Sequence, residues 1–265
     1  MGGRGSNSKI QNRTPQMQMQ PPKPQPPQQV KQQPPTDQNT PVIPTAVSNL
    51  SKMSDAQLAQ LVNNSKQAVM PNFLSDVADQ TQNFVYTAGI NEKPLVLDDA
   101  SFSQFMTDNG IGQAQVLTRS VDDITYTNRS GTRITMSAND VIDMMKYSRL
   151  NYIGGKVNGQ AYGAGTYFDM NGGRNTGYGK TSVTAVLNPS TARVITDTQL
   201  RAKAQQFAKT HPQFARAAGA YSTTFHNNNM SIYALAMGYN VIKDSSSGYH
   251  NVIDRSALVY KRSNM

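Results

Sequence analysis

Cysteine is absent from this chain of 265 residues, and histidine occurs three times. The absence of cysteine excludes disulfide bonds, thiolate metal sites and a cysteine nucleophile. His211, His226 and His250 lack the paired spacing of a zinc site, so we expect no bound metal. No run of about eighteen apolar residues occurs, and the first thirty residues contain no apolar signal core. We therefore expect a soluble protein that is not secreted by its own signal and does not associate with a membrane.

Apolar residues are also scarce, at 37% of the chain, and the deficit lies at its beginning. Proline and glutamine dominate from Pro15 to Pro44, and proline removes the backbone donor that helices and inner strands need. This stretch has too few apolar side chains to offset the entropy of ordering it. The composition predicts that residues 1–48 are a disordered Pro/Gln-rich tail with polyproline II character, serving as a spacer. Its P-x-x-P sequences leave a role as an SH3-type ligand open.

Acids are outnumbered by bases, which gives a formal net charge of +9. The tail, with five basic residues and the single acid Asp37, holds +4 of that charge. Such a surplus raises attraction to polyanions, including nucleic acid. No cluster of five or more Lys/Arg occurs, and the bases between positions 197 and 218 fit a solvated helix face better. Nucleic-acid binding therefore remains an open, unspecific alternative.

After the tail, the pattern predicts a helical cap over residues 49–110 and an α+β domain over residues 111–265. Ser54 and Gln57 form a capping box at the start of the first helix. Short strands and helices then alternate, which predicts a split, mainly antiparallel sheet with flanking helices. We expect strands at 115–121, 181–187, 192–195, 239–243, 251–254 and 255–260. We expect further helices from 75, over 98–106, from 137, over 197–218 with a break at His211-Pro212, and over 229–237.

Glycine is densest between Gln160 and Tyr178, around the run Thr166-Tyr167-Phe168. Glycine lets a backbone turn sharply or approach a ligand closely, because it has no Cβ. The tyrosines of this segment offer flat faces that suit a planar ring such as a nucleobase or nicotinamide. The same residues also fit a glycine-rich loop that enters a strand, with the tyrosines in the core. From the residues alone, both interpretations stay open.

The run Gly163-Ala164-Gly165-Thr166-Tyr167-Phe168-Asp169-Met170 resembles the G-x-G-(I/T)-Y-F-(A/S) segment of the ADP-ribosyltransferase superfamily, especially its poly-ADP-ribose polymerase branch. In that branch a second tyrosine follows, and the two tyrosines enclose the nicotinamide ring of NAD. Tyr178 follows Tyr167 by eleven residues, which is that family's spacing. The resemblance implies the superfamily's split antiparallel α+β fold with NAD as substrate. It also implies a binding site that includes Gly163, Gly165, Thr166, Tyr167 and Tyr178.

Arg119-Ser120 ends the first strand predicted in the α+β domain. Without context, Arg119 reads as a surface charge at a strand end. In the superfamily, however, the first core strand ends in Arg-(Ser/Gly) or His-Gly, and the arginine holds the dinucleotide. A guanidinium fork suits phosphate better than the point charge of a lysine does. The resemblance therefore implies that Arg119 and Ser120 bind NAD, and that Arg119 and Tyr167 form the catalytic pair.

A catalytic glutamate is missing. Transferases of this class carry one just before the strand that corresponds to Asn251–Asp254, where it holds a ribose hydroxyl and stabilises the oxocarbenium-like transition state. Tyr249 occupies that position here, and no glutamate follows Glu92. Asp244 could replace the glutamate only if its loop placed the carboxylate next to the same ribose. Asp254 fits a turn residue better. The binding half of the motif is present and the catalytic half is not.

Several blocks also resemble a group of phage-encoded proteins of Gram-positive hosts. They are MGGRG at the start, FVYTAGINEKP, YGAGTYFD, SIYALAMGYNVI and NVIDRSAL. One expectation is a phage ADP-ribosyltransferase that modifies a host or viral macromolecule. The alternative is a catalytically degenerate virion protein on the same fold, such as a minor capsid protein, tethered to capsid, portal or DNA by its basic tail. Either would place the protein in the virion, the host cytoplasm or both.

Overall fold

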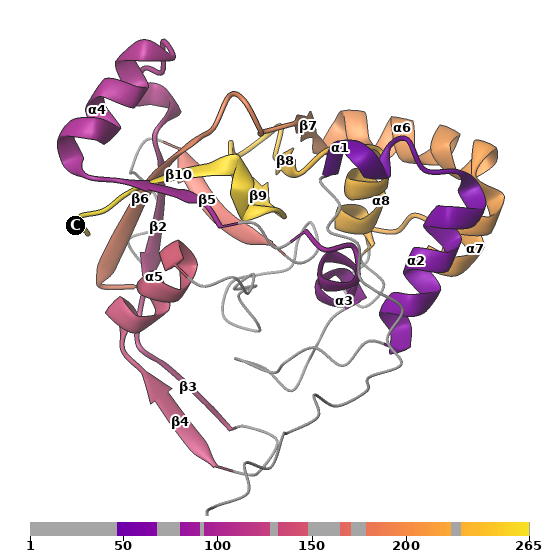
Figure 1. The fold of residues 1–265 in the computed structure, drawn as a ribbon, viewed down its shortest axis with the longest axis horizontal. Helices are drawn as coiled ribbons and strands as arrows, with labels where there is room; N and C mark the ends of the chain where they lie inside the picture. The colour runs from indigo at the N-terminus through magenta and orange to yellow at the C-terminus, as the bar shows by residue number, and fades with distance from the viewer. Residues whose placement is uncertain are drawn as a thin grey trace, which may run out of the picture. The chain divides into compact units, whose positions relative to one another are not determined.

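One eight-stranded sheet organises the computed structural model, which describes residues 47–67, 80–90, 93–127, 132–147, 165–170, 179–223 and 229–264. The strand order is β1-β10-β6-β2-β5-β9-β8-β7 (Figure 1). The two edge pairs, β1 with β10 and β7 with β8, are parallel, and the inner pairs are antiparallel. The strands are β1 (Leu95–Leu97), β2 (Leu117–Val121), β5 (Thr166–Met170), β6 (Thr181–Leu187), β7 (Val194–Thr196), β8 (Val241–Lys243), β9 (His250–Val252) and β10 (Leu258–Lys261). The prediction of an α+β fold with a mainly antiparallel sheet is confirmed.

Helix ends follow from local chemistry. The capping box is present: Ser54 N donates to Gln57 Oε1 at 2.9 Å, and Gln57 N donates to Ser54 Oγ at 3.3 Å. Pro212 starts a new helix directly after His211, and Gly238 ends another with φ 87°. The helices are α1 (Val47–Leu50), α2 (Asp55–Gln67), α3 (Gln80–Thr87), α4 (Asp99–Asp108), α5 (Ala138–Tyr147), α6 (Asp197–Thr210), α7 (Pro212–Ala218) and α8 (Met230–Ala236). One-turn 3-10 helices span Gln113–Gln115 and Arg255–Ala257.

Helix α5 covers one face of the sheet, which we call the α5 face (Figure 1). Alternate residues of the central strands point to it, as the period of two in a strand requires. They pack with Val141, Ile142 and Met145 of α5, all of them fully buried. The sheet residues of this core are Leu117, Val121, Phe168, Val183, Ala185, Val241, Val252, Leu258 and Tyr260.

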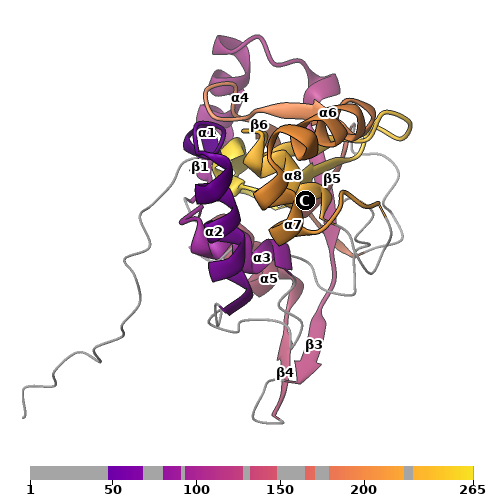
Figure 2. The same ribbon diagram turned by 90° about the vertical axis from the view of Figure 1, so that its right-hand side faces the viewer.

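The opposite face carries two separate apolar clusters. At one end α4 packs through Phe102 on Val186 and Val259. At the other end α1, α2, α3, α6, α7 and α8 share a core with Ile195 and Ile242 (Figures 1 and 2). Helices α1, α2 and α3 thus share one core with α6, α7 and α8 of the predicted α+β domain, whereas α4 packs in the separate cluster. Between the two clusters lies the centre of the sheet, on β6, β2 and β5.

The first described helix includes the last two residues of the range predicted as the tail. Helix α1 starts at Val47, inside the range assigned to the tail, because Val47 and Leu50 are buried in the core. The rest of the predicted tail lies outside the described residues. The chain divides into two units, Met1–Thr40 and Pro41–Met265, and the second contains every described residue.

Two further elements were not predicted. Strand β1 extends the sheet edge by pairing in parallel with β10, with Leu95 opposite Val259. Strands β3 (Ile124–Thr127) and β4 (Arg133–Met136) form a separate antiparallel ribbon. This ribbon projects away from the main sheet in both views (Figures 1 and 2).

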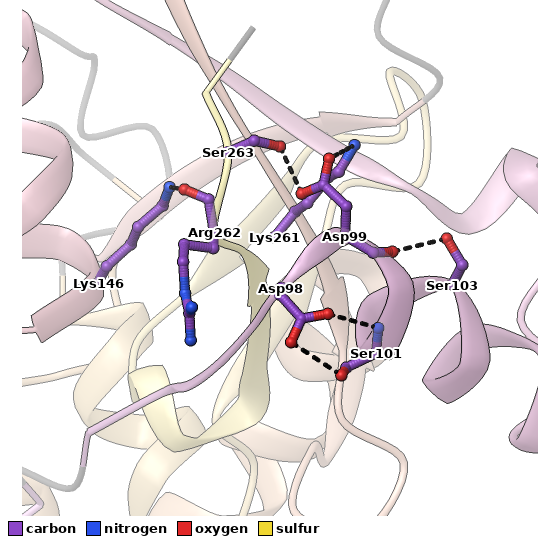
Figure 3. Close-up of polar contacts among 8 residues, drawn as sticks. All are labelled: Asp98, Asp99, Ser101, Ser103, Lys146, Lys261, Arg262 and Ser263. Carbon is purple, nitrogen blue, oxygen red and sulfur yellow. Dashed lines mark hydrogen bonds and ion pairs between the residues drawn. The ribbon is translucent and has the colours of Figure 1, made fainter.

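The last residues of the chain are fastened to both α4 and α5 (Figure 3). Lys146 of α5 is 1% exposed, and its ammonium donates to the carbonyl oxygen of Arg262 and to Asn264 Oδ1, both at 2.7 Å. Asp99 at the start of α4 pairs with Lys261 at 3.1 Å and accepts from Ser263 Oγ at 2.7 Å. We call these contacts the C-terminal clasp.

Candidate functional site

Three segments that the resemblance assigns to an NAD site lie on three neighbouring strands. Arg119 and Ser120 are in β2, Thr166 and Tyr167 are in β5, and Tyr249 immediately precedes β9. β5 lies between the other two: it pairs with β2 on one side and with β9 on the other. The fold therefore brings together segments that are far apart in the sequence.

The sheet splits beside these residues. β2 pairs with β5 at Leu117↔Met170 and Thr118↔Asp169, and no further pair is formed between these two described strands. Beyond that point β2 continues along β6, whereas the first half of β5 pairs with β9. The Arg119 side chain bridges the diverging strands, since its Nη1 donates to the carbonyl oxygen of Tyr167 at 3.1 Å. Arg119 and Tyr167 are thus in direct contact.

Arg119 lies on the α5 face, in register with Val183, and is 4% exposed. A second buried guanidinium, that of Arg255, donates from Nη1 to the carbonyl oxygens of Met144 at 3.1 Å and Met145 at 2.9 Å. These carbonyls belong to the last turn of α5, where a cation is favoured. Burial raises the pKa of the nearby Tyr260 phenol well above its usual range, and the positive charges of Arg255 and Arg119 oppose that rise. Two guanidinium groups, those of Arg119 and Arg255, are therefore buried on the α5 face.

The opposite face carries a band of polar side chains between its two apolar clusters. Their shared face follows from strand alternation and from the register Thr184↔Thr118↔Asp169. The hydroxyls of Ser120 and Ser182, from adjacent strands, lie 3.2 Å apart. We call this set the polar band; it comprises Thr118 and Ser120 of β2, Ser182 and Thr184 of β6, and Tyr167 and Asp169 of β5.

Burial varies along the polar band. Thr118, Asp169 and Thr184 are 9%, 5% and 7% exposed, whereas Ser120, Ser182 and Tyr167 are half-buried. Thr184 Oγ1 is buried and, within the described part of the chain, has no hydrogen-bond partner. A buried hydroxyl in that position is costly unless another molecule satisfies it. The band therefore reaches solvent at one end and has unused hydrogen-bonding capacity inside.

The glycine-tyrosine segment is described from Gly165 to Met170. A Cβ at Gly165 would overlap the side chain of Asn251 and lie 3.0 Å from the carbonyl oxygen of Val252. Glycine is thus required here because β9 packs directly against it. Thr166 is buried at 2% exposed, opposite Val252. The predicted contacts of Gly163 and Tyr178 lie outside the described residues.

Asp244 and Asp254, the two acids considered as substitutes for the missing glutamate, both accept hydrogen bonds that stabilise turns. Asp244 Oδ1 accepts from Ser246 N, Ser246 Oγ and Ser247 N at 2.6–2.7 Å, which holds the loop between β8 and β9. Asp254 accepts from Ser256 N and Ser256 Oγ, and so caps the 3-10 helix that follows β9. The prediction that Asp254 is a turn residue is confirmed.

The sequence did not single out the polar band. No motif marks four of its members, Thr118, Ser182, Thr184 and Asp169. The alternation of polar and apolar residues over 181–187 does predict a half-buried strand. That alternation is a signal that one face of a strand is polar, but it does not reveal which strands will be neighbours.

Among the described residues, no group of three or more His, Asp or Glu side chains could hold a metal ion. No helix in the described ranges is both long and apolar enough to cross a lipid bilayer. Comparisons of the chain with protein-family models, with curated proteins and with solved structures found no match.

Proposed function

We propose that this protein is a bacteriophage ADP-ribosyltransferase, which binds NAD at the split in the sheet and transfers ADP-ribose to a host or viral macromolecule. The observation that carries the proposal is the position of Arg119, Tyr167 and the chain at Tyr249 on neighbouring strands. Nothing local in the sequence requires these three segments to meet. The acceptor would be encountered in the host cytoplasm or on delivery from the virion.

The side chains at the split fit the parts of NAD. A dinucleotide presents two phosphates, two ribose rings and two planar bases. The half-buried ring of Tyr167 supplies a flat face for nicotinamide, and the hydroxyls of Ser120, Ser182 and Thr184 match ribose hydroxyls. The Arg119 guanidinium lies on the α5 face of the split, where it holds the backbone carbonyl of Tyr167 and supplies positive charge for a phosphate. Tyr178 and Gly163 remain predicted members of the same site.

A second candidate is a catalytically degenerate virion protein, associated with head or portal, on the same fold. It is favoured by one specific observation: Tyr249 replaces the glutamate, and both neighbouring acids, Asp244 and Asp254, serve as turn caps. On this alternative, the basic tail tethers the protein to capsid or DNA. It predicts co-purification with virions and no turnover of NAD.

Release of nicotinamide from NAD, measured with purified full-length protein, tests the proposal. Tyr167→Ala is expected to weaken NAD binding about 10- to 100-fold, because stacking a ring on an aromatic side chain contributes about 1–3 kcal/mol. Tyr167→Phe keeps the ring and should bind nearly as well as wild type. Tyr147→Ala, which removes a tyrosine that is 45% exposed on α5, is the matched control and should change nothing.

A second arm supplies host lysate and NAD labelled on the adenylate. Label on a macromolecule that appears with wild type and is lost with Tyr167→Ala would identify the acceptor. If wild type neither releases nicotinamide nor gains thermal stability with NAD, the transferase proposal is wrong. The degenerate virion protein would then be the better description.

A further inference from the structure

Asp169 is a carboxylate in the interior of the central strand β5, at 5% exposed. Acidic side chains are rarely buried to this degree, because removing a charge from water is costly. It stands two residues after Tyr167, so the two side chains leave the strand on the same face. The superfamily motif that this segment resembles has alanine or serine at this position, where this chain has an aspartate.

The register places Asp169 at the centre of the polar band. On one side it lies directly opposite Thr118 of β2, which is itself opposite Thr184 of β6. On the other side, β5 and β9 pair at Phe168↔His250. One step further along this antiparallel register sets Asp169 opposite Tyr249. Directly opposed residues have Cβ atoms about 4.5–5.5 Å apart, so the two positions share one local site.

The other acids near the split have structural tasks. Asp122 Oδ1 accepts from Lys180 N at 3.3 Å, and Asp123 Oδ1 accepts from Ala138 N at the start of α5 at 2.8 Å. Asp244 and Asp254 hold turns on either side of β9. These four acids lie outside the polar band, whereas the strand register places Asp169 within it, opposite Thr118.

Cleavage of NAD is accelerated by a carboxylate close to C1′ of the nicotinamide ribose. The bond between ribose C1′ and the nicotinamide nitrogen breaks, and its electron pair leaves with the nitrogen, which becomes neutral. Positive charge then develops on C1′ and the ring oxygen, as in glycoside cleavage. The oxygen of water or of an acceptor hydroxyl bonds to C1′ and releases its proton to solvent. A fixed negative charge beside C1′ stabilises this transition state more than the ground state.

We propose that Asp169 is the catalytic carboxylate of this site, in place of a glutamate at the position of Tyr249. In this proposal the negative charge lies on β5, one strand away from the start of β9, where the superfamily has its glutamate. This inference rests on the proposed function, since it requires that NAD binds beside Tyr167. It also removes the main objection to that function, the missing glutamate.

The test compares Asp169→Asn with wild type in two measurements, NAD binding and nicotinamide release. Asparagine keeps the shape of the side chain and removes its charge. We expect NAD affinity to stay within about threefold and nicotinamide release to fall at least about 100-fold. Asp143→Asn, which neutralises an exposed acid on α5, is the control and should retain the wild-type rate. Should Asp169→Asn fail to fold, Asp169→Ser is measured against the same criteria.

The results separate the two proposals. A wild type that releases nicotinamide and a folded Asp169→Asn that releases it equally fast would overturn the role of Asp169 and leave the proposed function standing. Equal losses of NAD affinity and of rate would also overturn it, because they indicate a structural role. A wild type that does not bind or cleave NAD would overturn both proposals.

A second experiment tests whether positions 169 and 249 share one site, by placing a carboxylate at position 249 when the one at position 169 has been removed. In the Asp169→Asn background, Tyr249→Glu is expected to recover at least about 10-fold in nicotinamide release, since the register sets the two positions opposite each other. Tyr249→Gln in the same background is the matched control without a charge, and should recover nothing. A Tyr249→Glu variant that is folded and shows no gain over Tyr249→Gln would contradict the shared site.

Discussion

Gly165, which the resemblance places in the NAD site, also packs against the side chain of Asn251. A Cβ at this position would overlap Oδ1 of Asn251, which is fully buried, and would lie 3.0 Å from the carbonyl oxygen of Val252. We expect Gly165→Ala to lower the free energy of unfolding by about 1–3 kcal/mol, as overpacking of a core does. Gly112→Ala is the control, because a Cβ there meets Gln115 Oε1 at 3.9 Å and nothing closer. Urea denaturation measures both.

A double variant identifies the cause. In a chain that already carries Asn251→Ala, the added cost of Gly165→Ala should shrink by 0.5 kcal/mol or more, roughly the smallest coupling seen between residues in contact. If the two costs simply add, the clash with Asn251 is not the reason for glycine at this position.

His250 couples stability to pH. It is 5% exposed in β9, its Nδ1 lies 2.9 Å from the carbonyl oxygen of Gly248, and Lys243 faces it from β8. Burial lowers the pKa of its imidazole from 6.5 to about 4, and the charge of Lys243 acts in the same direction. The folded protein therefore binds this proton less readily than the unfolded chain does. Its contribution to stability is fully present above pH 6.5 and is lost as the pH falls toward 4.

Denaturation of wild type and His250→Asn over this pH range measures the effect. The asparagine amide can occupy the place of Nδ1 and does not titrate. We expect wild type to lose about 3 kcal/mol more than the variant between pH 7 and pH 4. Parallel curves for the two proteins would show that His250 is not the titrating group.

At the scale of elements, the C-terminal clasp makes α5 depend on the end of the chain. Ending the chain at Lys261 removes both acceptors of the buried Lys146 ammonium, the carbonyl oxygen of Arg262 (Figure 3) and Asn264 Oδ1. We expect this truncation to lower the free energy of unfolding by about 2–4 kcal/mol, because the buried ammonium loses both of its hydrogen-bond acceptors. Thermal melting of the two chains measures the loss.

Lys146→Met provides the matched test of that explanation. Methionine has a similar length and needs no acceptor, so the truncated chain that carries it should regain most of the lost stability. A truncated chain that melts as low with methionine as with lysine would mean that the clasp acts through other contacts, such as Asp99 with Lys261 and Ser263.

The elements that the sequence predicted well have local causes. The capping box at Ser54, the break at Pro212 and the glycine after α8 each act within one helical turn, so their outcome is readable in a few residues. Strand β6 was predicted over its observed span because seven residues suffice to display alternation. Strand β1 has three residues, too few for a period, and it exists because β10 offers an edge.

At the scale of the molecule, the order of the strands in the sheet brings the residues of the candidate site together. That order cannot be read from any local sequence pattern. The sequence offered Arg119 and Tyr167 through a resemblance, but their contact depends on β2 and β5 being neighbours that diverge. The sequence did not indicate a role for Asp169 either, because that role depends on which strands are neighbours. Its place opposite Thr118, and one residue beyond the last pair of β5 with β9, appears once the strands are paired.

The boundary between the tail and the folded unit gives a prediction for the whole chain. The buried core begins at Val47 and Leu50, which are 5% and 0% exposed. A chain that starts at Pro41 should therefore unfold at the same denaturant concentration as the full chain, in line with the predicted spacer role of the tail. A chain that starts at Ser54 loses α1, and with it two core side chains, so its free energy of unfolding should fall by about 2–5 kcal/mol. A loss of stability already on starting at Pro41 would show that the first forty residues contribute to the fold, and would contradict the prediction that they are disordered.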